Sequence, residues 1–411
     1  MLMLLGMAGM AVAQNNTNSP YTRYGYGQLV DQGPANSKGM GGIAYGVRDK
    51  NHVNFVNPAS YSAVDSLTFI FDGGVSLQNT NFSNGTLKTN AKNSSFDYVS
   101  MLFRAAPWCG VSLGVLPYSN VGYGMTGTLE NSGNADNSAQ VTYAGDGGLH
   151  QAYIGASFKL FKDFSVGANI SYLWGDIIHM RGETYPSDAS VFPLTIQNTM
   201  TVRSYKLDIG AQYTFNVGKK HAVTLGAVFT PGHDLSNSIE ILTQTGNSTT
   251  GSTTSTRDSV ATSGLAATWG AGLTYVYDGR LTVGVDGMVQ QWDDVSFMNN
   301  ADAFSKRMKV AVGAEYQPNP LGRNYFSVVK YRVGGYFTKP YYKVGGVRAA
   351  NEYGITAGLA LPISRTRSLL NLSAQYVCTK GKVASFLDER TLRLCIGLTF
   401  NERWFFKRKV D

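Results

Sequence analysis

Apolar and polar residues alternate along many segments of the chain. From Phe164 to Trp174, every second residue is apolar or aromatic, whereas the residues between them are small or polar. The same alternation recurs over residues 205–215 and 265–277. Because successive side chains of a strand point to opposite faces, each segment predicts a strand with one apolar and one polar face.

Fourteen such segments follow one another along the chain. Their apolar faces run about ten residues and end in Tyr, Phe or Trp, which is typical of strands that cross an outer membrane. Short connections, such as residues 162–163 and 278–280, alternate with long polar ones, such as 181–197 and 245–256. We therefore predict an all-β fold, a 14-stranded antiparallel transmembrane β-barrel over residues 64–401, with both termini in the periplasm.

A soluble sandwich or propeller is the alternative interpretation of the same strands. Such folds are usually made of strands of about five or six residues, roughly half the length seen here. An open sheet in lipid is excluded because its unpaired backbone groups would each cost several kcal/mol. Strand length therefore favours the membrane barrel.

The first thirteen residues are uncharged and mostly apolar, and they end in Ala11-Val12-Ala13. This pattern predicts a signal peptide over residues 1–13, cleaved after Ala13. A membrane-spanning helix would need roughly 20 apolar residues, and the polar run from Gln14 arrives too early. We expect export to the outer membrane of a Gram-negative cell.

Composition and motifs narrow the functional classes. The chain has 47 Gly, 24 Tyr and 20 Phe but only 15% charged residues, which suits alternating strands. Its formal charge of +8 is spread along the chain without a basic stripe, so we expect no nucleic-acid partner. The five histidines are isolated, and no hydrolase, protease or phosphate-loop motif stands in a suitable context. We expect no enzyme activity, metal or cofactor.

A barrel of fourteen strands is too wide to be filled by its own side chains. Residues 14–63 precede the first strand and are rich in Gly, yet they contain many apolar residues, so they predict a plug in the lumen. Charged residues on the lumen faces predict a network that holds this plug, in preference to a ligand site; they are Lys206, Asp208, Asp286, Lys309, Glu315 and Arg393.

Two short motifs in the predicted plug carry a resemblance to a known family. Gly39-Met40-Gly41-Gly42 is followed by Asn57-Pro58-Ala59 and then by an apolar strand. This arrangement resembles the N-terminal hatch of the FadL-type outer-membrane transport family. The match covers the hatch by motif and the remaining chain by strand count and layout. The resemblance implies a fourteen-stranded barrel in which these seven residues belong to the hatch or gate.

Pro117 interrupts the third predicted strand and is followed by Gly122 and Gly124. Proline cannot donate a hydrogen bond to a neighbouring strand, so its position predicts a bulge or a local break in pairing. In FadL-type barrels an inward kink of the third strand opens a lateral exit, and the resemblance implies such a kink here. The alternative is a proline at the barrel rim.

Two functions follow from these observations. The first is passive uptake of a hydrophobic, fatty-acid-like small molecule from the outer loops through a lateral opening, with outer-membrane lipid around the barrel. The alternative, also implied by the resemblance, is a scaffold or shuttle subunit of a secretion or barrel-assembly complex in Bacteroidota-like bacteria. The tail of residues 402–411 predicts a site for a periplasmic or outer-membrane protein, or else an interfacial anchor, through Trp404, Phe405, Phe406, Lys407, Arg408 and Lys409.

Overall fold

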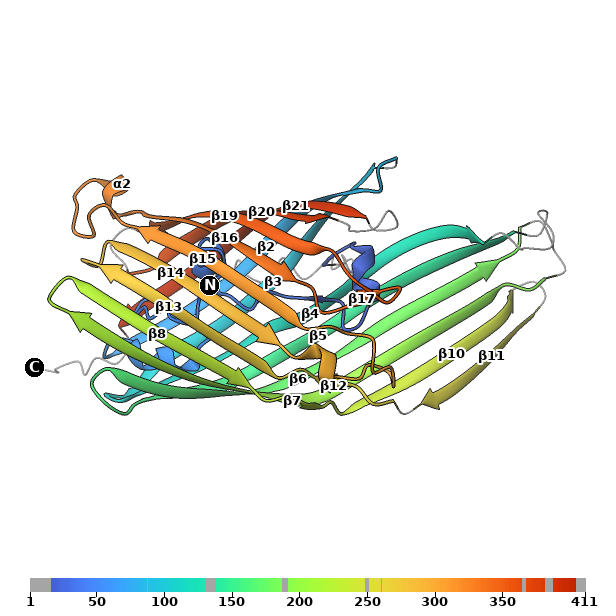
Figure 1. Cartoon of the computed structure of the whole chain (residues 1–411), viewed down its shortest axis with the longest axis horizontal. Coiled ribbons are helices and arrows are strands. Elements are labelled where there is room, and N and C mark those ends of the chain that lie inside the picture. Colours follow the sequence, from blue (N-terminus) through green and yellow to red (C-terminus); the bar gives the residue numbers. More distant parts are fainter. Residues whose placement is uncertain are drawn as a thin grey trace, which may run out of the picture.

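The structure is a computed structural model that describes residues 16–86, 88–129, 138–186, 191–247, 251–259, 261–363, 367–380 and 387–403. Fourteen strands within these ranges form a closed antiparallel barrel, which confirms the predicted fold class (Figure 1). The last barrel strand pairs with the first along sixteen residues, from Thr68–Arg403 to Ser83–Asp388. The barrel strands are β2 (Thr68–Ser83), β3 (Lys88–Ala106), β4 (Cys109–Leu129), β5 (Ala139–Lys159), β6 (Phe164–Thr184), β7 (Leu194–Val217), β8 (His221–Thr230), β13 (Thr268–Tyr277), β14 (Leu281–Gln290), β15 (Arg307–Tyr316), β16 (Lys330–Lys339), β19 (Asn351–Pro362), β20 (Leu369–Lys380) and β21 (Asp388–Arg403).

The barrel wall is uneven in height. Strands β4 to β7 have 21 to 24 residues, whereas β8 and β13 to β16 have 10 each. An extra hairpin of β10 (Asn237–Asn247) and β11 (Gly251–Ser259) pairs with the first half of β7. We call the end with the short connections the turn end, and the opposite end, where β5, β6 and β7 extend, the far end (Figure 1).

Two predicted loops contain strand residues. Strand β6 continues to Thr184 and β7 begins at Leu194, within the predicted loop of residues 181–197. Most of the predicted loop of residues 245–256 belongs to the β10 and β11 hairpin. Beyond the lipid, polar side chains are solvated on both faces of a strand, so no alternation marks the pairing, although the β-branched threonines favour it. The turn end also has one long connection, residues 317–329, which includes α2 (Tyr325–Val328).

The outer surface of the barrel is apolar. Ile170, Val333 and Ile355 are 57%, 60% and 67% exposed, while the residues next to Ile170 and Ile355 along their strands, such as Ser171 and Thr356, are buried inside. A closed barrel with an apolar outer face is the form in which strands can span a lipid bilayer. Within the described ranges, no helix has the length and apolar character needed to cross a membrane.

The barrel interior holds residues 16–64, which we call the N-terminal segment. It contains four short elements: η1 (Pro20–Arg23), β1 (Gln28–Leu29), α1 (Ala35–Lys38) and η2 (Pro58–Ala63). Ile43, Val53 and Tyr61 in this segment have no exposed surface, and their neighbours include inward-facing residues of the barrel strands. The hydrophobic core therefore lies between the N-terminal segment and the barrel wall.

An aromatic cluster closes the lumen at the far end. Trp292 is completely buried, and its ring lies 4.9 Å from that of Tyr341, 5.5 Å from Phe304 and 5.6 Å from Tyr26. Trp292 begins η3 (Trp292–Asp294), directly after β14, and Tyr341 follows β16. We call Tyr26, Trp292, Phe304 and Tyr341 the aromatic cap. Because Tyr26 belongs to the N-terminal segment, this segment reaches from the cap to the turn end.

Candidate functional site: a break in the barrel wall and its cover

Strands β3 and β4 pair only near the turn end. Their pairing runs from Ala106 opposite Cys109 to Val99 opposite Val115. Farther along, β3 is paired with β2 and β4 with β5, but not with each other. Figure 1 shows the β2 and β3 pair diverging from β4 and β5 towards the far end. The barrel wall thus has a lateral break in its strand pairing.

The N-terminal segment lies along the free edge of β4. Strand β1 adds to this edge, with Gln28 opposite Asn120 and Leu29 opposite Ser119. Three more hydrogen bonds join Gln32 Nε2 to the Pro117 carbonyl (3.0 Å), the Val30 N–H to the Tyr118 carbonyl (3.0 Å) and Thr22 Oγ1 to the Gly122 carbonyl (3.1 Å). These bonds satisfy backbone groups that the missing β3 pairing leaves open.

The same segment also contacts the barrel wall on the far side of β3, at β2 and β21. The Ser19 hydroxyl donates to the Glu389 carboxylate of β21 at 2.5 Å, and the Gln78 amide of β2 donates to the Asn16 carbonyl at 3.0 Å. The Tyr21 hydroxyl donates to the Leu387 carbonyl at 2.6 Å. Residues 16–32 therefore bridge the break from β2 and β21 to β4.

The predicted kink residues lie at this break. Pro117 stands two residues beyond the last β3–β4 pair, and the register of β4 with β5 shifts between Pro117 and Ser119. Gly122 binds Thr22 through both its N–H and its carbonyl. Gly124 has open space around it, since an added Cβ would meet no atom within 4 Å.

The Gly39-Met40-Gly41-Gly42 turn is seated on β15, β16 and β19. Gly41 and Gly42 have φ values of 70° and 87°, in the left-handed region that favours glycine. The Gly41 N–H donates to Thr356 Oγ1 at 2.8 Å, and Met40 is buried against Gly313. This turn therefore fixes one part of the N-terminal segment to one sector of the wall.

The Asn57-Pro58-Ala59 turn is seated on another sector, formed by β5, β6 and β7. Asn57 is the N-cap of η2, and its side chain accepts a hydrogen bond from the Ala59 N–H at 3.1 Å. Its amide donates to the Tyr45 carbonyl at 2.7 Å and to the Ala211 carbonyl of β7 at 3.3 Å. Asn57 thus joins two turns of the segment to the wall.

We expect Asn57→Ala to lower the free energy of unfolding by about 1 to 3 kcal/mol, because it leaves the buried Ala59 N–H without its cap. Asn319→Ala is the matched control, since Asn319 makes the same kind of local contact, to the Leu321 N–H, but is exposed. Urea unfolding in micelles measures both. Equal losses in the two variants would contradict the assigned role of Asn57.

The six predicted lumen charges do not form one network. Asp286 accepts from the backbone N–H groups of Ala44 and Tyr45, at 2.5 and 2.8 Å. Lys309 pairs with Asp31 at 2.9 Å. The other four bind residues of the wall. Lys206 and Asp208 pair with each other at 2.5 Å. Glu315 pairs with Lys330 at 2.9 Å and with Arg332 at 2.7 Å, and Arg393 donates to Gln78 at 3.2 Å and to Gln375 at 3.5 Å.

Further ion pairs, which sequence reasoning missed, bind the segment to the wall. Lys38 and Asp97 of β3 lie 2.7 Å apart, with side chains only 5% and 6% exposed. Asp49 lies 3.5 Å from Lys330, which connects the segment to Glu315. The N-terminal segment has no regular alternation of apolar and polar residues from which these ion-pair partners could be inferred.

Protonation in the segment follows from burial and neighbouring charge. Burial lowers the pKa of His52 to about 4, although the carboxylate of Asp49 acts in the opposite direction. Burial alone would raise the pKa of Asp49, but the Lys330 ammonium and other charges hold that pKa below its usual range. At neutral pH the segment therefore carries an ionised Asp49 and a neutral His52.

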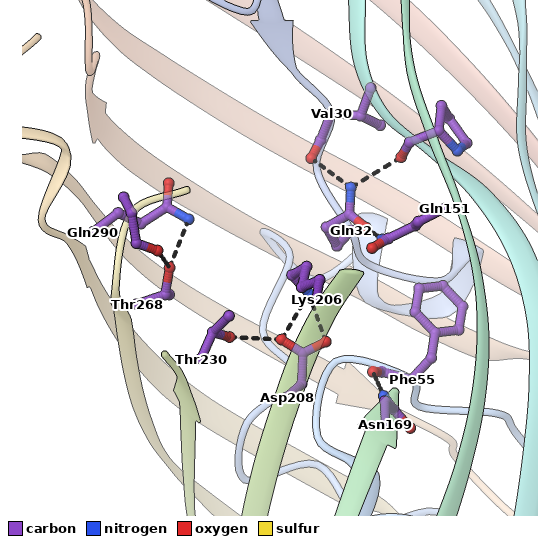
Figure 2. Close-up of polar contacts among 12 residues, drawn as sticks. Val30, Gln32, Phe55, Gln151, Asn169, Lys206, Asp208, Thr230, Thr268 and Gln290 are labelled. Carbon is purple, nitrogen blue, oxygen red and sulfur yellow. Dashed lines mark hydrogen bonds and ion pairs between the residues drawn. The ribbon is translucent and has the colours of Figure 1, made fainter. Parts of the chain in front are cut away.

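A cavity of ≈ 130 Å³ lies between the N-terminal segment and the wall, beside the break. Figure 2 shows its polar contacts: Gln32 is joined to Gln151, and Asp208 to Lys206 and Thr230. The other lining residues are mixed: Val30, Phe55 and Tyr118 are apolar or aromatic, and charged residues such as Arg307 and Lys309 lie among them. Within the described ranges, no three His, Cys, Asp or Glu side chains lie close enough to hold a metal ion.

The whole chain, residues 1–411, matches a protein family described as BamG. The chain belongs to the BamG family. No curated protein matches it.

This BamG family member shares its fold with solved structures of transporters. It is similar to the P. putida toluene transporter TodX, at 14% identity and a TM-score of 0.62, over 93% of this chain and 100% of that one. It is also similar to the Ralstonia pickettii toluene transporter TbuX, at 13% identity and 0.61, over 90% and 97%. A Pseudomonas aeruginosa FadL homologue gives 13% identity and 0.61, over 93% and 100%. The resemblance to FadL-type barrels is confirmed for the fold, whereas the family itself carries a different name.

Proposed function

We propose that this BamG family member is a closed outer-membrane barrel that serves as a subunit of a secretion or barrel-assembly complex. The observation that supports this proposal is the double closure of the lumen. Residues 16–32 cover the lateral break, and the aromatic cap covers the far end. A channel for a hydrophobic solute needs a continuous apolar route, and here the chain itself occupies both ends of that route.

The number of contacts along the cover supports a structural role. Each hydrogen bond between the segment and β4 contributes roughly 0.5 to 1.5 kcal/mol net, so removing the whole cover would cost several kcal/mol. The Lys38 and Asp97 pair adds a buried ionic contact that cannot be broken without leaving a charge in the interior. A barrel that needs no opening can keep such contacts permanently.

Passive uptake of a hydrophobic small molecule is the second candidate. It is supported by the cavity beside the break, whose apolar side includes Val30, Phe55 and Tyr118, and by the shared fold with the toluene transporters. In this case the cover would have to leave β4, and solute would pass sideways next to Pro117 into the membrane. The transfer of apolar surface, at roughly 25 cal/mol per Å², would drive it.

A disulfide lock separates the two functions. Leu29 and Ser119 are opposite residues of the β1 and β4 pair, so cysteines at these positions lie within reach of a bond. We expect the oxidised Leu29→Cys, Ser119→Cys protein, in a background without the three native cysteines, to support growth and assembly like its reduced form. Uptake of labelled toluene by cells is measured in parallel, with the Ser119→Cys single variant as control. If oxidation abolishes toluene uptake by the double variant but not by the single variant, and reduction restores it, the channel function is favoured.

A protein partner of the tail remains a prediction. Trp404, Phe405, Phe406, Lys407, Arg408 and Lys409 lie outside the described residues, whereas Glu402 and Arg403 are the last residues of β21. A complex subunit needs at least one docking surface, and the tail has aromatic residues and an arginine, which are enriched at protein interfaces. Co-purification of the full chain with its partners from detergent extracts, compared with a chain ending at residue 403, tests this role.

A further inference from the structure

Three neighbouring turns at the turn end present apolar and basic side chains together. Trp108 in the β3–β4 turn stacks on Phe158 of β5, with ring centroids 5.7 Å apart, and its carbonyl accepts from the Lys159 N–H at 2.8 Å. The β5–β6 turn is tied to β7 by a hydrogen bond from the Thr214 N–H to the Asp163 carbonyl. We call Trp108, Phe158, Lys159, Phe161, Lys162 and Lys219 the rim patch.

The apolar members of the rim patch face outward although they belong to well-formed turns. Trp108 is 55% exposed, Phe158 40% and Phe161 72%. Phe158 lies on the same outer face of β5 as Ile154, which is 57% exposed and faces the lipid. The rim patch therefore continues the lipid-facing surface of the barrel up to the turns.

The basic members of the rim patch lack acidic partners. Lys159, Lys162 and Lys219 are exposed, and none of them takes part in an ion pair within the described ranges. Asp163 supplies the one negative charge in the three turns, while Lys220 next to Lys219 is 4.0 Å from Asp278. The patch consequently presents positive charge without paired carboxylates, in the same turns and strand ends as its aromatic rings.

We infer that the rim patch binds anionic phospholipids of the periplasmic leaflet. Short turns of such barrels face the periplasm, which places the patch at the level of the inner headgroups. Aromatic rings prefer this interfacial level, and lysine side chains can extend from the apolar zone to reach phosphate groups. Acyl chains would lie against Phe158 and Trp108, with the lipid phosphates at Lys162 and Lys219 in the turns. Lys159 alternates with Phe158, but it is the exposed last residue of β5, so its long side chain can extend around the strand end to the same level.

An acidic protein is the other class of partner for a basic patch. Lipid is favoured because the aromatic members continue the lipid-facing face of β5 without a change of direction, whereas a protein interface would need a surface outside the bilayer. The inference does not depend on which of the two proposed functions is correct, since a channel and a complex subunit both stand in the same membrane.

The test compares two triple variants that change the charge equally. The rim variant carries Lys159→Gln, Lys162→Gln and Lys219→Gln. The control carries Lys88→Gln, Lys92→Gln and Lys380→Gln, three exposed lysines at the far end. Both full-length proteins are placed in nanodiscs of equal parts phosphatidylglycerol and phosphatidylcholine, and the lipids retained on release into detergent are counted by native mass spectrometry.

We expect the rim variant to retain at least about fivefold less phosphatidylglycerol than the control. Each lysine close to an anionic membrane surface adds to the electrostatic attraction for its lipids, and the rim variant loses three such lysines. Retention by the wild type should fall as salt is raised, and retention of phosphatidylcholine should not change. Equal phosphatidylglycerol retention by both variants would overturn the inference. Loss of a co-purifying acidic protein from the rim variant, with phosphatidylglycerol retained, would overturn it in favour of a protein partner. Heat-modifiable migration on gels confirms that both variants are folded.

Discussion

Replacing Gly226 with alanine should unseat the N-terminal segment from the barrel wall. A Cβ at this position of β8 would lie 1.8 Å from the Tyr45 carbonyl oxygen and 2.4 Å from its carbon. Both atoms belong to the backbone, so no side-chain rotation can relieve the clash. We expect a loss of about 1 to 3 kcal/mol or more in the free energy of unfolding, as for other overpacked interiors. Limited proteolysis should cut the N-terminal segment faster than in the wild type.

Gly287→Ala is the matched control for this substitution. Gly287 lies in the neighbouring part of the wall, on β14, and an added Cβ there would meet no atom within 4 Å. The two variants make the same change in strand propensity, and they differ in the backbone atoms of Tyr45 and Gly46 that the new Cβ would meet only at position 226. If both proteins unfold alike and resist protease alike, the segment is not held by close contact with the wall.

For the inward-facing glycines, the sequence predicts that a group packs closely against them but not which group it is. Alternation along β8 places Gly226 on the lumen face, and a glycine there indicates that something approaches closely. The identity of the approaching group is not predictable in the same way. Tyr45 is far from Gly226 along the chain, and the N-terminal segment has no period that would place its carbonyl.

The number of strands could be predicted from the sequence, but their full length could not. A strand in lipid must keep one apolar face outward, so a shift by one residue would expose every polar residue to the membrane. This constraint makes the barrel strands visible in the sequence. Beyond the membrane the constraint disappears, and the far halves of β6 and β7 and the β10 and β11 hairpin could not be separated from loops.

The sequence pattern also did not predict that residues 16–32 cover the lateral break. Pro117 indicates a disturbance of the third strand, because proline cannot donate to a neighbour. The partner, β1, is only two residues long, and it is a strand solely because β4 offers an unpaired edge. A strand of this kind has no sequence signature of its own.

A bulge explains why one central charge escaped prediction. The register of β2 with β3 shifts between Gly74 and Val75, so that Gly74 pairs with Tyr98 and Val75 with Phe96. Asp97 is the extra residue on β3, and it points inward as Tyr98 does, while Phe96 is exposed. Bulges redirect side chains in this way, and strict alternation cannot place both neighbours on one face. The lumen thereby gains a carboxylate for Lys38.

Asp97→Asn should therefore have one of the largest effects on stability in this protein. It leaves the Lys38 ammonium, which is 5% exposed, without its carboxylate partner at 2.7 Å. Removing one member of a buried ion pair typically costs about 3 to 5 kcal/mol, because the remaining charge is neither hydrated nor paired. We expect the midpoint of urea unfolding in micelles to fall accordingly, while asparagine can keep the contact of Ser76 with position 97.

Two further variants identify the charge as the cause. Asp65→Asn removes a carboxylate whose partners Lys50 and Arg367 have side chains that are 59% and 44% exposed, so it should cost less than about 1 kcal/mol. Adding Lys38→Met to Asp97→Asn should recover most of the lost stability, because replacement of both charges avoids an unpaired ion in the interior. If the double variant remains as unstable as Asp97→Asn, packing around β3 is responsible and the ion pair does not hold the segment. A fall in stability for Asp65→Asn equal to that for Asp97→Asn would likewise show that burial of the pair is unimportant.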